Sequence, residues 1–346
     1  MRLQPARSIP TWIGRTAAAL DPGYFALVMA TGIISNAFFL AGPRIVSHVL
    51  FAFNLVAYAW LCMLTAVRAV RFAAALWADL TSPRRVFLFF TTVAATDVLG
   101  MSIALRGFAT TALALWLLAF ALLLALIYLG FGVLLFRHAG DADVIGGAWL
   151  NAIVAIQSIA ILGGAAALPA AHAAPQVFLL LPALWTVALA LYAIFIVLLA
   201  NRIFFHPITR DEVTPPLWIV MGAAAISVNA GAIVANDAGV TAFLQSLRPV
   251  VDTVTLATWA WATWWIPLLV FIGMWKHGLH RVPIRYTPML WSMVFPLGMY
   301  AVATLRFSQL AAVPALALWS HAMAWIALAA WAATATGLIV TAARSG

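Results

Sequence analysis

Charged side chains are scarce in this chain of 346 residues: Lys, Arg, Asp and Glu make up 8% of it, whereas apolar and aromatic residues make up 66%. A water-soluble domain needs far more charge to cover its surface. Cysteine is almost absent as well, and the single Cys62 excludes an internal disulfide. The composition therefore excludes a soluble domain and predicts that lipid is the solvent for most of the chain.

The sequence signatures of common enzymes and of ATP-driven pumps are missing. The chain has no HExxH, GxSxG, P-loop or GxGxxG motif. His277 and His280 lie in a basic loop without a nearby Cys, Asp or Glu, so we expect no metal site there. We expect no cofactor and no catalytic residue. The alternative, an integral-membrane enzyme acting on a lipid-linked substrate, would need clustered acids, histidines or a metal site at one interface.

Long apolar runs dominate the chain. A membrane-spanning helix needs roughly 20 mostly apolar residues, and the sequence contains ten runs of suitable length. They cover about 23–42, 46–67, 86–105, 108–136, 148–168, 175–200, 217–236, 250–275, 288–305 and 312–342. We expect one all-α integral-membrane domain over residues 23–342, a cytoplasmic tail over 1–22 and a short cytoplasmic end over 343–346.

The distribution of the basic residues predicts which side of the membrane each turn occupies. If the turns between runs alternate between the two sides of the membrane, one side holds four of the eighteen Lys and Arg residues: Arg44, Arg106, Arg248 and Arg306. The other fourteen lie on the side of the termini. Basic residues flank the cytoplasmic ends of membrane helices, which predicts cytoplasmic termini in a bacterial-type plasma membrane. The formal charge of +9 is thus explained by topology, and we expect no nucleic-acid partner.

A repeat of about 65 residues divides the ten runs into five helical hairpins. The odd-numbered runs each contain an internal glycine at an even period: Gly32, Gly100, Gly163, Gly231 and Gly298. A repeated unit of this length indicates several copies of one supersecondary element. The odd runs also carry much of the polar content, whereas the even runs are bulkier. Small and polar side chains avoid lipid, so we expect the odd helices to form an inner ring around a pore, in a quasi-five-fold arrangement. The alternative is that the small residues only allow close helix packing.

Asp97 is an acidic residue well inside an apolar run. A charged side chain at the bilayer centre costs about 3 kcal/mol on insertion scales and usually faces a cavity or a partner. One interpretation makes Asp97 a contact for protons or substrate. The other makes it a hydrogen-bonded residue that holds the bundle together. The sequence leaves both open.

Two segments resemble a known family. LDPGYFALVMATGIISNAFFLAG (20–42) is similar to the first helix of the tellurite-resistance/dicarboxylate transporter family, and WSMVFPLGMYAVATL (291–305) is similar to its ninth helix. The family includes a bacterial tellurite-resistance protein, fungal malate and sulfite transporters, and the plant slow anion channel. The resemblance covers nearly the whole chain in helix number and repeat.

The resemblance implies ten helices around a central pore, commonly in a homotrimer embedded in membrane lipid. It implies transport of small anions, among them inorganic anions, sulfite and C4-dicarboxylates such as malate. It also implies a phenylalanine that closes the pore, and Phe295 is the matching position. Pro296 cannot donate a backbone hydrogen bond and predicts a kink beside Phe295, while Gly298 leaves space next to the axis.

We expect the outer mouth of such a pore to be basic. Arg106 and Arg306 end the third and ninth runs on the outer side. Fixed positive charge at a pore mouth concentrates anions, which makes these two arginines candidates for anion attraction.

Overall fold

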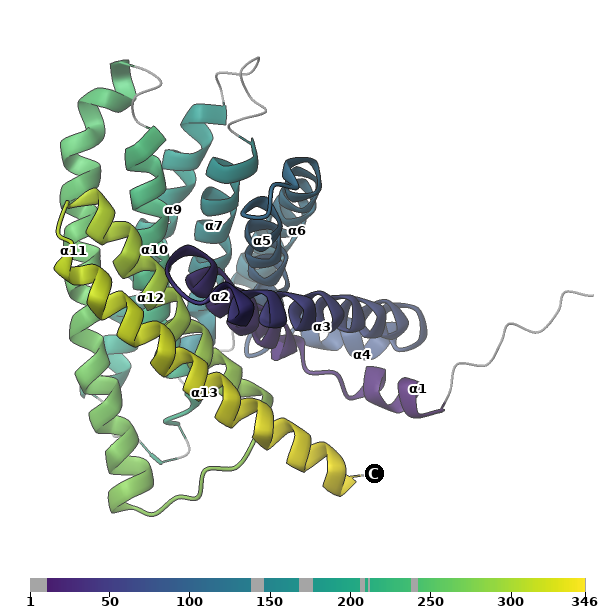
Figure 1. Cartoon of the computed structure of the whole chain (residues 1–346). Coiled ribbons are helices and arrows are strands. Elements are labelled where there is room, and N and C mark those ends of the chain that lie inside the picture. Colours follow the sequence, from purple (N-terminus) through teal and green to yellow (C-terminus); the bar gives the residue numbers. More distant parts are fainter. Residues whose placement is uncertain are drawn as a thin grey trace, which may run out of the picture.

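A computed structural model describes residues 11–137, 146–167, 177–205, 209–210, 212–237 and 242–345. The described residues form helices joined by turns (Figure 1). Ten of these helices are long and apolar enough to cross a membrane, and they coincide with the ten predicted runs within a few residues at most ends. The prediction of an all-α protein with ten membrane-spanning helices is confirmed.

The ten helices follow one another as five hairpins, in which a shorter helix is followed by a longer one that packs against it. The shorter helices are α2 (Ala26–Ala41), α5 (Phe90–Ala104), α7 (Asn151–Leu162), α10 (Ile219–Asp237) and α12 (Trp291–Leu310). The longer ones are α3 (Arg44–Arg71), α6 (Ala109–Arg137), α9 (Val177–Phe205), α11 (Ala242–Gly273) and α13 (Ala315–Ser345).

The two sets of helices differ sharply in burial. Between 78% and 89% of the residues in the spans that contain the shorter helices are buried, against 11% to 33% in the longer ones. The shorter helices are therefore the inner set. The longer helices present exposed apolar side chains such as Phe136, Val197 and Phe271, as expected for a surface that faces lipid.

The inner helices form a closed ring. Each packs against the inner helix before it and the one after it in the chain, and α12 packs against α2. In Figure 1, α2 and α12 lie side by side although they belong to the first and last hairpins. Ring closure in chain order is what a quasi-five-fold arrangement requires.

A second pattern repeats around the ring. An aromatic side chain of each outer helix shares a hydrogen bond with the inner helix of the next hairpin in cyclic order. The five pairs are Tyr58 with Thr96, Trp116 with the carbonyl of Ile159, Trp185 with the carbonyl of Ser227, Trp259 with Thr304, and Trp331 with Thr31, at 2.8–3.1 Å. These bonds link neighbouring hairpins, because α13 closes the cycle onto α2.

Each inner helix also begins in the same way, with a short 3₁₀ turn. These turns are η1 (Pro22–Phe25), η2 (Val86–Phe89), η4 (Gly147–Leu150), η7 (Pro215–Trp218) and η10 (Pro288–Leu290). Three of them start with proline. Proline suits the first turn of a helix, because a backbone N–H at that position has no partner within the helix and its absence therefore costs nothing. The shared start indicates that the five hairpins are copies of one unit.

The structure adds elements that the apolar runs did not predict. The predicted N-terminal tail contains a short helix, α1 (Thr11–Ala18), that packs on α3; residues 1–10 lie outside the described residues. Another short helix, α4 (Ala73–Leu80), follows α3 directly. Helix α11 begins at Ala242, earlier than the predicted 250, and continues through Pro249. Between α5 and α6 the chain reverses at Gly107, whose φ of +90° suits glycine best.

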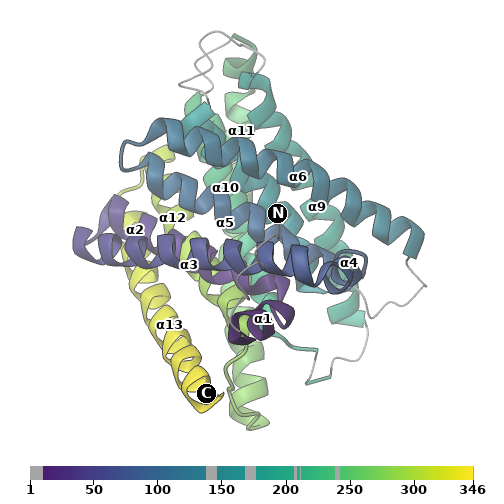
Figure 2. The ribbon, with the colours of Figure 1, turned by 90° about the vertical axis from the view of Figure 1, so that its right-hand side faces the viewer.

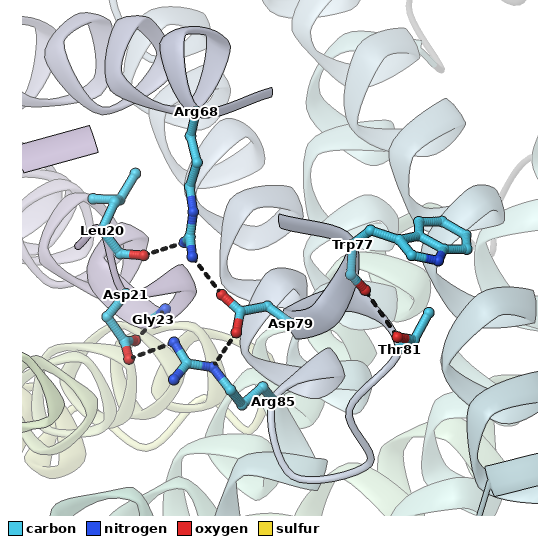
Figure 3. Close-up of polar contacts among 8 residues, drawn as sticks. All are labelled: Leu20, Asp21, Gly23, Arg68, Trp77, Asp79, Thr81 and Arg85. Carbon is cyan, nitrogen blue, oxygen red and sulfur yellow. Dashed lines mark hydrogen bonds and ion pairs between the residues drawn. The ribbon is translucent and has the colours of Figure 1, made fainter. Parts of the chain in front are cut away.

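The inner helices run in parallel, so the ring has an N-terminal side, where they begin, and a C-terminal side, where they end. Helix α1 and the last turn of α13 lie at the same end of the bundle (Figure 2). The N-terminal side also holds an ion-pair cluster between α3, α4 and the turns that open α2 and α5, which we call the clamp: Asp21, Arg68, Asp79 and Arg85 (Figure 3).

Candidate functional site

A narrow cavity lies inside the C-terminal half of the ring. All five inner helices contribute to its wall, which is formed by Ile33, Asn36, Leu40, Asp97, Val98, Met101, Leu105, Ser158, Ile161, Ile226, Asn229, Ile233, Met299, Val302 and Arg306. Its free volume is about 30 Å³, which is room for about two water molecules. The wall is mainly apolar, with a few polar side chains.

Arg306 supplies positive charge to this cavity. It lies near the C-terminal end of α12, half buried, and makes no hydrogen bond or ion pair with any residue that the structure describes. A guanidinium held without a partner in an apolar wall is ready to bind an anion, since its five N–H groups are all donors.

Arg106, the other predicted anion-attracting residue, is placed differently. It lies outside the cavity wall, and its guanidinium donates hydrogen bonds to the carbonyl of Ser102 (2.7 Å) and to the hydroxyl of Ser47 (2.9 Å). The same group stacks over the ring of Phe51 at 3.8 Å. Arg106 thus joins α3 to the end of α5, and the structure brings only one of the two predicted arginines into the cavity that it describes.

Asp97 lies in the cavity wall and is 1% exposed. Its Oδ2 accepts a hydrogen bond from the Ser158 hydroxyl at 2.7 Å. Its Oδ1 is buried and has no hydrogen-bond partner among the described residues. The structure therefore identifies one bonded partner and leaves the other carboxyl oxygen buried without a described partner.

Two asparagines complete the polar part of the wall. Asn36 is fully engaged within α2 and α5: its Oδ1 accepts from Ser102 (2.7 Å), and its Nδ2 donates to the carbonyl of Val98 (3.4 Å). Asn229 is not. Its Nδ2 faces only the sulfur of Met299 at 4.0 Å, and its Oδ1 is buried without a partner among the described residues. Ser158 and Asn229 belong to the polar content of the odd-numbered runs that the sequence showed, but the sequence assigned them no role at a site.

Phe295 shares a helix face with the cavity residues of α12. The spacing from Phe295 to Met299, Val302 and Arg306 is four, three and four residues, which places all four on one side of a helix with 3.6 residues per turn. Two contacts fix the direction of that side. Pro296 packs against Gly222 of α10, and Gly298 lies against Ile33 of α2. The face of Phe295 lies between them and points toward the centre of the ring.

Phe295 sits one turn from Met299 toward the N-terminal side and is 2% exposed. It does not belong to the cavity wall itself. Its ring therefore lies where the cavity ends. The kink predicted at Pro296 remains a prediction, and α12 continues through this proline.

The five repeat glycines lie at contacts between helices. A methyl group at Gly32 would lie 2.7 Å from the side chains of Asn54 and Val98, and one at Gly100 would lie 2.5 Å from Leu162. Gly163 and Gly231 make room for Trp116 and Trp185, two of the aromatic residues that link neighbouring hairpins. None of the five glycines lies in the wall of the cavity described above. These contacts are packing contacts, and a pore-lining or kinking role for the five glycines stays a prediction.

The family model of the voltage-dependent anion channel matches residues 19–339. The chain belongs to the voltage-dependent anion channel family. The match covers all ten spanning helices except for the C-terminal end of the last one, so the cavity, Phe295 and Arg306 all lie within it. The family resemblance seen in the sequence is confirmed.

Two curated relatives come from strains of Mycobacterium tuberculosis, and each is named an uncharacterized membrane protein. Each is 39% identical to this chain over 155 residues, which is 43% of this chain and 77% of the relative. They support a membrane protein and add nothing about what is transported. Membership of the voltage-dependent anion channel family favours transport over the alternative of a membrane enzyme.

Proposed function

We propose that this chain conducts small anions across the membrane through the ring of inner helices. The observation that carries the proposal is the cavity itself. Its wall is drawn from all five inner helices, and it holds Arg306 without a partner among the described residues. Membership of an anion-channel family supports the same proposal.

Phe295 acts in this proposal as the gate. Its face of α12 is the face that lines the cavity, and it lies where the cavity ends. A buried aromatic ring on the axis excludes water and ions as an apolar constriction. A rotamer change of one ring is enough to open such a constriction, because the backbone of α12 can stay in place.

The proposal is tested with the purified chain in liposomes. We expect flux of a small inorganic anion such as chloride above that of protein-free liposomes, measured with the membrane potential held at zero. Sulfite and malate serve as further arms, because the family resemblance admits all three anion classes. Absence of flux for every anion, in the wild type and in a variant with Phe295 replaced by alanine, would contradict the proposal.

Arg306 and Arg106 allow a test of anion attraction in which one variant is the control for the other. Arg306→Gln removes the cavity charge, and we expect anion flux to fall by roughly tenfold at low ionic strength, since fixed charge raises local ion concentration by about 10-fold or more. The loss should shrink at high salt, which shortens the screening length from about 10 Å at 0.1 M to about 3 Å at 1 M.

Arg106→Gln is the control for this prediction. It breaks the bonds between α5 and Ser47, so we expect reduced thermal stability and no salt-dependent change in flux per folded protein. If Arg306→Gln lowers anion flux equally at low and high salt, Arg306 has a structural role, like Arg106, and does not attract anions.

We also propose cytoplasmic termini in a plasma membrane of bacterial type. Helix α1 and the last turn of α13 lie at one end of the bundle (Figures 1 and 2). Arg68 and Arg71 lie in the last turn of α3, on which α1 packs, and Arg84 and Arg85 directly precede η2, as expected for a cytoplasmic face. The cavity then opens outward. A homotrimer follows from the family resemblance alone and is checked by mass measurement of the purified protein.

A further inference from the structure

The hydrogen bonds of Ser158 place two acceptors on one hydroxyl group. Its Oγ lies 2.7 Å from Oδ2 of Asp97 and 2.8 Å from the carbonyl oxygen of Ala155. A serine hydroxyl has one hydrogen to donate, so it cannot serve both. Two arrangements of the hydrogen atoms are possible. In the first, Ser158 donates to an ionised Asp97. In the second, Ser158 donates to the carbonyl of Ala155 and accepts the hydrogen of a neutral Asp97. The positions of the three oxygen atoms are therefore compatible with either protonation state of Asp97.

The protonation state of Asp97 determines the net charge of the cavity. Arg306 and Asp97 are the basic and acidic residues in its described wall. When Asp97 is ionised, the two charges cancel. When Asp97 is neutral, the cavity keeps the positive charge of Arg306. An anion inside a weakly polarisable wall responds strongly to this difference, since charges interact more strongly there than in water.

We infer that Asp97 is a protonation switch that sets whether the cavity binds an anion. The inference rests on the proposed function and adds its regulation. A proton from the aqueous solution forms an O–H bond with the Asp97 carboxylate, and the net charge of the cavity rises by one. The Nδ2 group of Asn229, whose described contact is the Met299 sulfur at 4.0 Å, is then a hydrogen-bond donor available to the anion beside Arg306. Proton binding and anion binding favour each other, and this coupling is reciprocal.

The surroundings of Asp97 contain few other groups that could produce this effect. From α3, the titratable residues in this region are Tyr58, which is bonded to Thr96 next to Asp97, and Cys62, one turn further along α3. From α7 the facing residue is Ser158, and from α2 it is Asn36; neither titrates. The described part of α6 faces α5 with apolar side chains and the indole of Trp116. Across the cavity, α10 contributes Asn229 and α12 contributes Arg306, which stays charged.

The test measures chloride flux in liposomes between roughly pH 8 and pH 5, a range over which a buried carboxyl changes charge. Potassium and valinomycin hold the membrane potential at zero. We expect wild-type flux to rise by roughly tenfold or more toward the acid end, the scale that one unit charge in a protein interior produces. Asp97→Asn should carry high flux at every pH, because it mimics the neutral acid. Asp97→Glu, which can still titrate, should keep a pH dependence.

A wild-type pH profile in Asp97→Asn would overturn the inference while leaving anion conduction intact. A second measurement does not depend on conduction or on the asparagine variant. Chloride is added to the wild-type protein in weakly buffered detergent solution, and the pH of the solution is followed. We expect uptake of up to about one proton per chain, the limit for a single linked group. No uptake would overturn the inference, whereas uptake without flux in liposomes would refute the proposed channel function and retain the switch.

Discussion

Replacing Phe295 with alanine is expected to raise anion conductance by roughly tenfold or more, since each 1.4 kcal/mol removed from a barrier is a factor of ten in rate. The ring lies on the face of α12 that lines the cavity, at the end of the cavity nearer the N-terminal side. Removing it leaves a water-accessible gap where an apolar side chain stood. The measurement is single-channel or macroscopic current in planar bilayers at a fixed chloride gradient.

Phe38 is a matched control for this experiment. It is 1% exposed, like Phe295, but it packs edge-to-face on Trp325 of α13 with ring centroids 5.0 Å apart. Phe38→Ala should lower stability, since truncating a buried phenylalanine costs about 3–5 kcal/mol, and should leave conductance unchanged. If Phe295→Ala instead shows normal conductance and lower thermal stability, the ring is packing material and the gate lies elsewhere.

Replacing Asp79 with asparagine is expected to destabilise the protein by about 3–5 kcal/mol, the cost of breaking a buried ion pair from one side. Asp79 is the centre of the clamp (Figure 3). Its Oδ2 accepts a hydrogen bond from Arg68 at 2.6 Å, and its Oδ1 forms an ion pair with Arg85 Nε at 2.8 Å. The side chains of Arg68 and Asp79 are 7% and 13% exposed, so Arg68 would keep an unpaired buried charge.

The clamp also reaches the start of the first inner helix. Arg68 donates a hydrogen bond to the carbonyl of Leu20, and Arg85 pairs with Asp21, which caps the turn η1 by accepting from the N–H of Gly23 at 2.8 Å. Loss of Asp79 should therefore loosen the entry to α2 and α5 as well as α4. The measurement is thermal denaturation in detergent, together with protease sensitivity of residues 72–85.

An exposed ion pair provides the comparison. Asp252 pairs with Arg248 one turn away on α11 at 2.9 Å, with both side chains about 40% exposed. Asp252→Asn should cost less than about 1 kcal/mol, as exposed pairs usually do. If Asp79→Asn and Asp252→Asn lower the thermal stability by similar amounts, the clamp contributes no more to stability than an exposed ion pair.

The sequence was sufficient to predict the helices and their division into two sets. Length and hydropathy identify a membrane helix because the bilayer allows few alternatives, and the even period of Gly32 to Gly298 pointed to the hairpin repeat. The glycines were a correct signal for the repeat, although the structure places them at helix contacts. The sequence could not predict the five hydrogen bonds that link neighbouring hairpins, because each joins residues in different hairpins. Their donors or acceptors on the outer helices are Tyr58, Trp116, Trp185, Trp259 and Trp331.

The site was predicted less completely for a related reason. Asp97 stood out because it is an acid inside an apolar run, and Arg306 because it ends one. The sequence could not say that Arg306 faces the cavity and Arg106 does not, since both end inner helices and the difference lies in their rotation about the helix axis. The same holds for Thr96 and Asp97, neighbours in sequence that face an outer helix and the cavity respectively.

The contact between α2 and α12 has a consequence for how the protein is made. Hairpins enter the membrane in the order of synthesis, from the N-terminus onward. The wall between α10 and α2 stays open until the fifth hairpin is inserted, because α12 is the helix that fills it. Phe295 and Arg306 both lie on α12, so the side chains assigned to closing the pore and to attracting anions enter together with the last wall. Under the proposed function, the ring of inner helices is therefore complete only once the helix that carries the gate is in place.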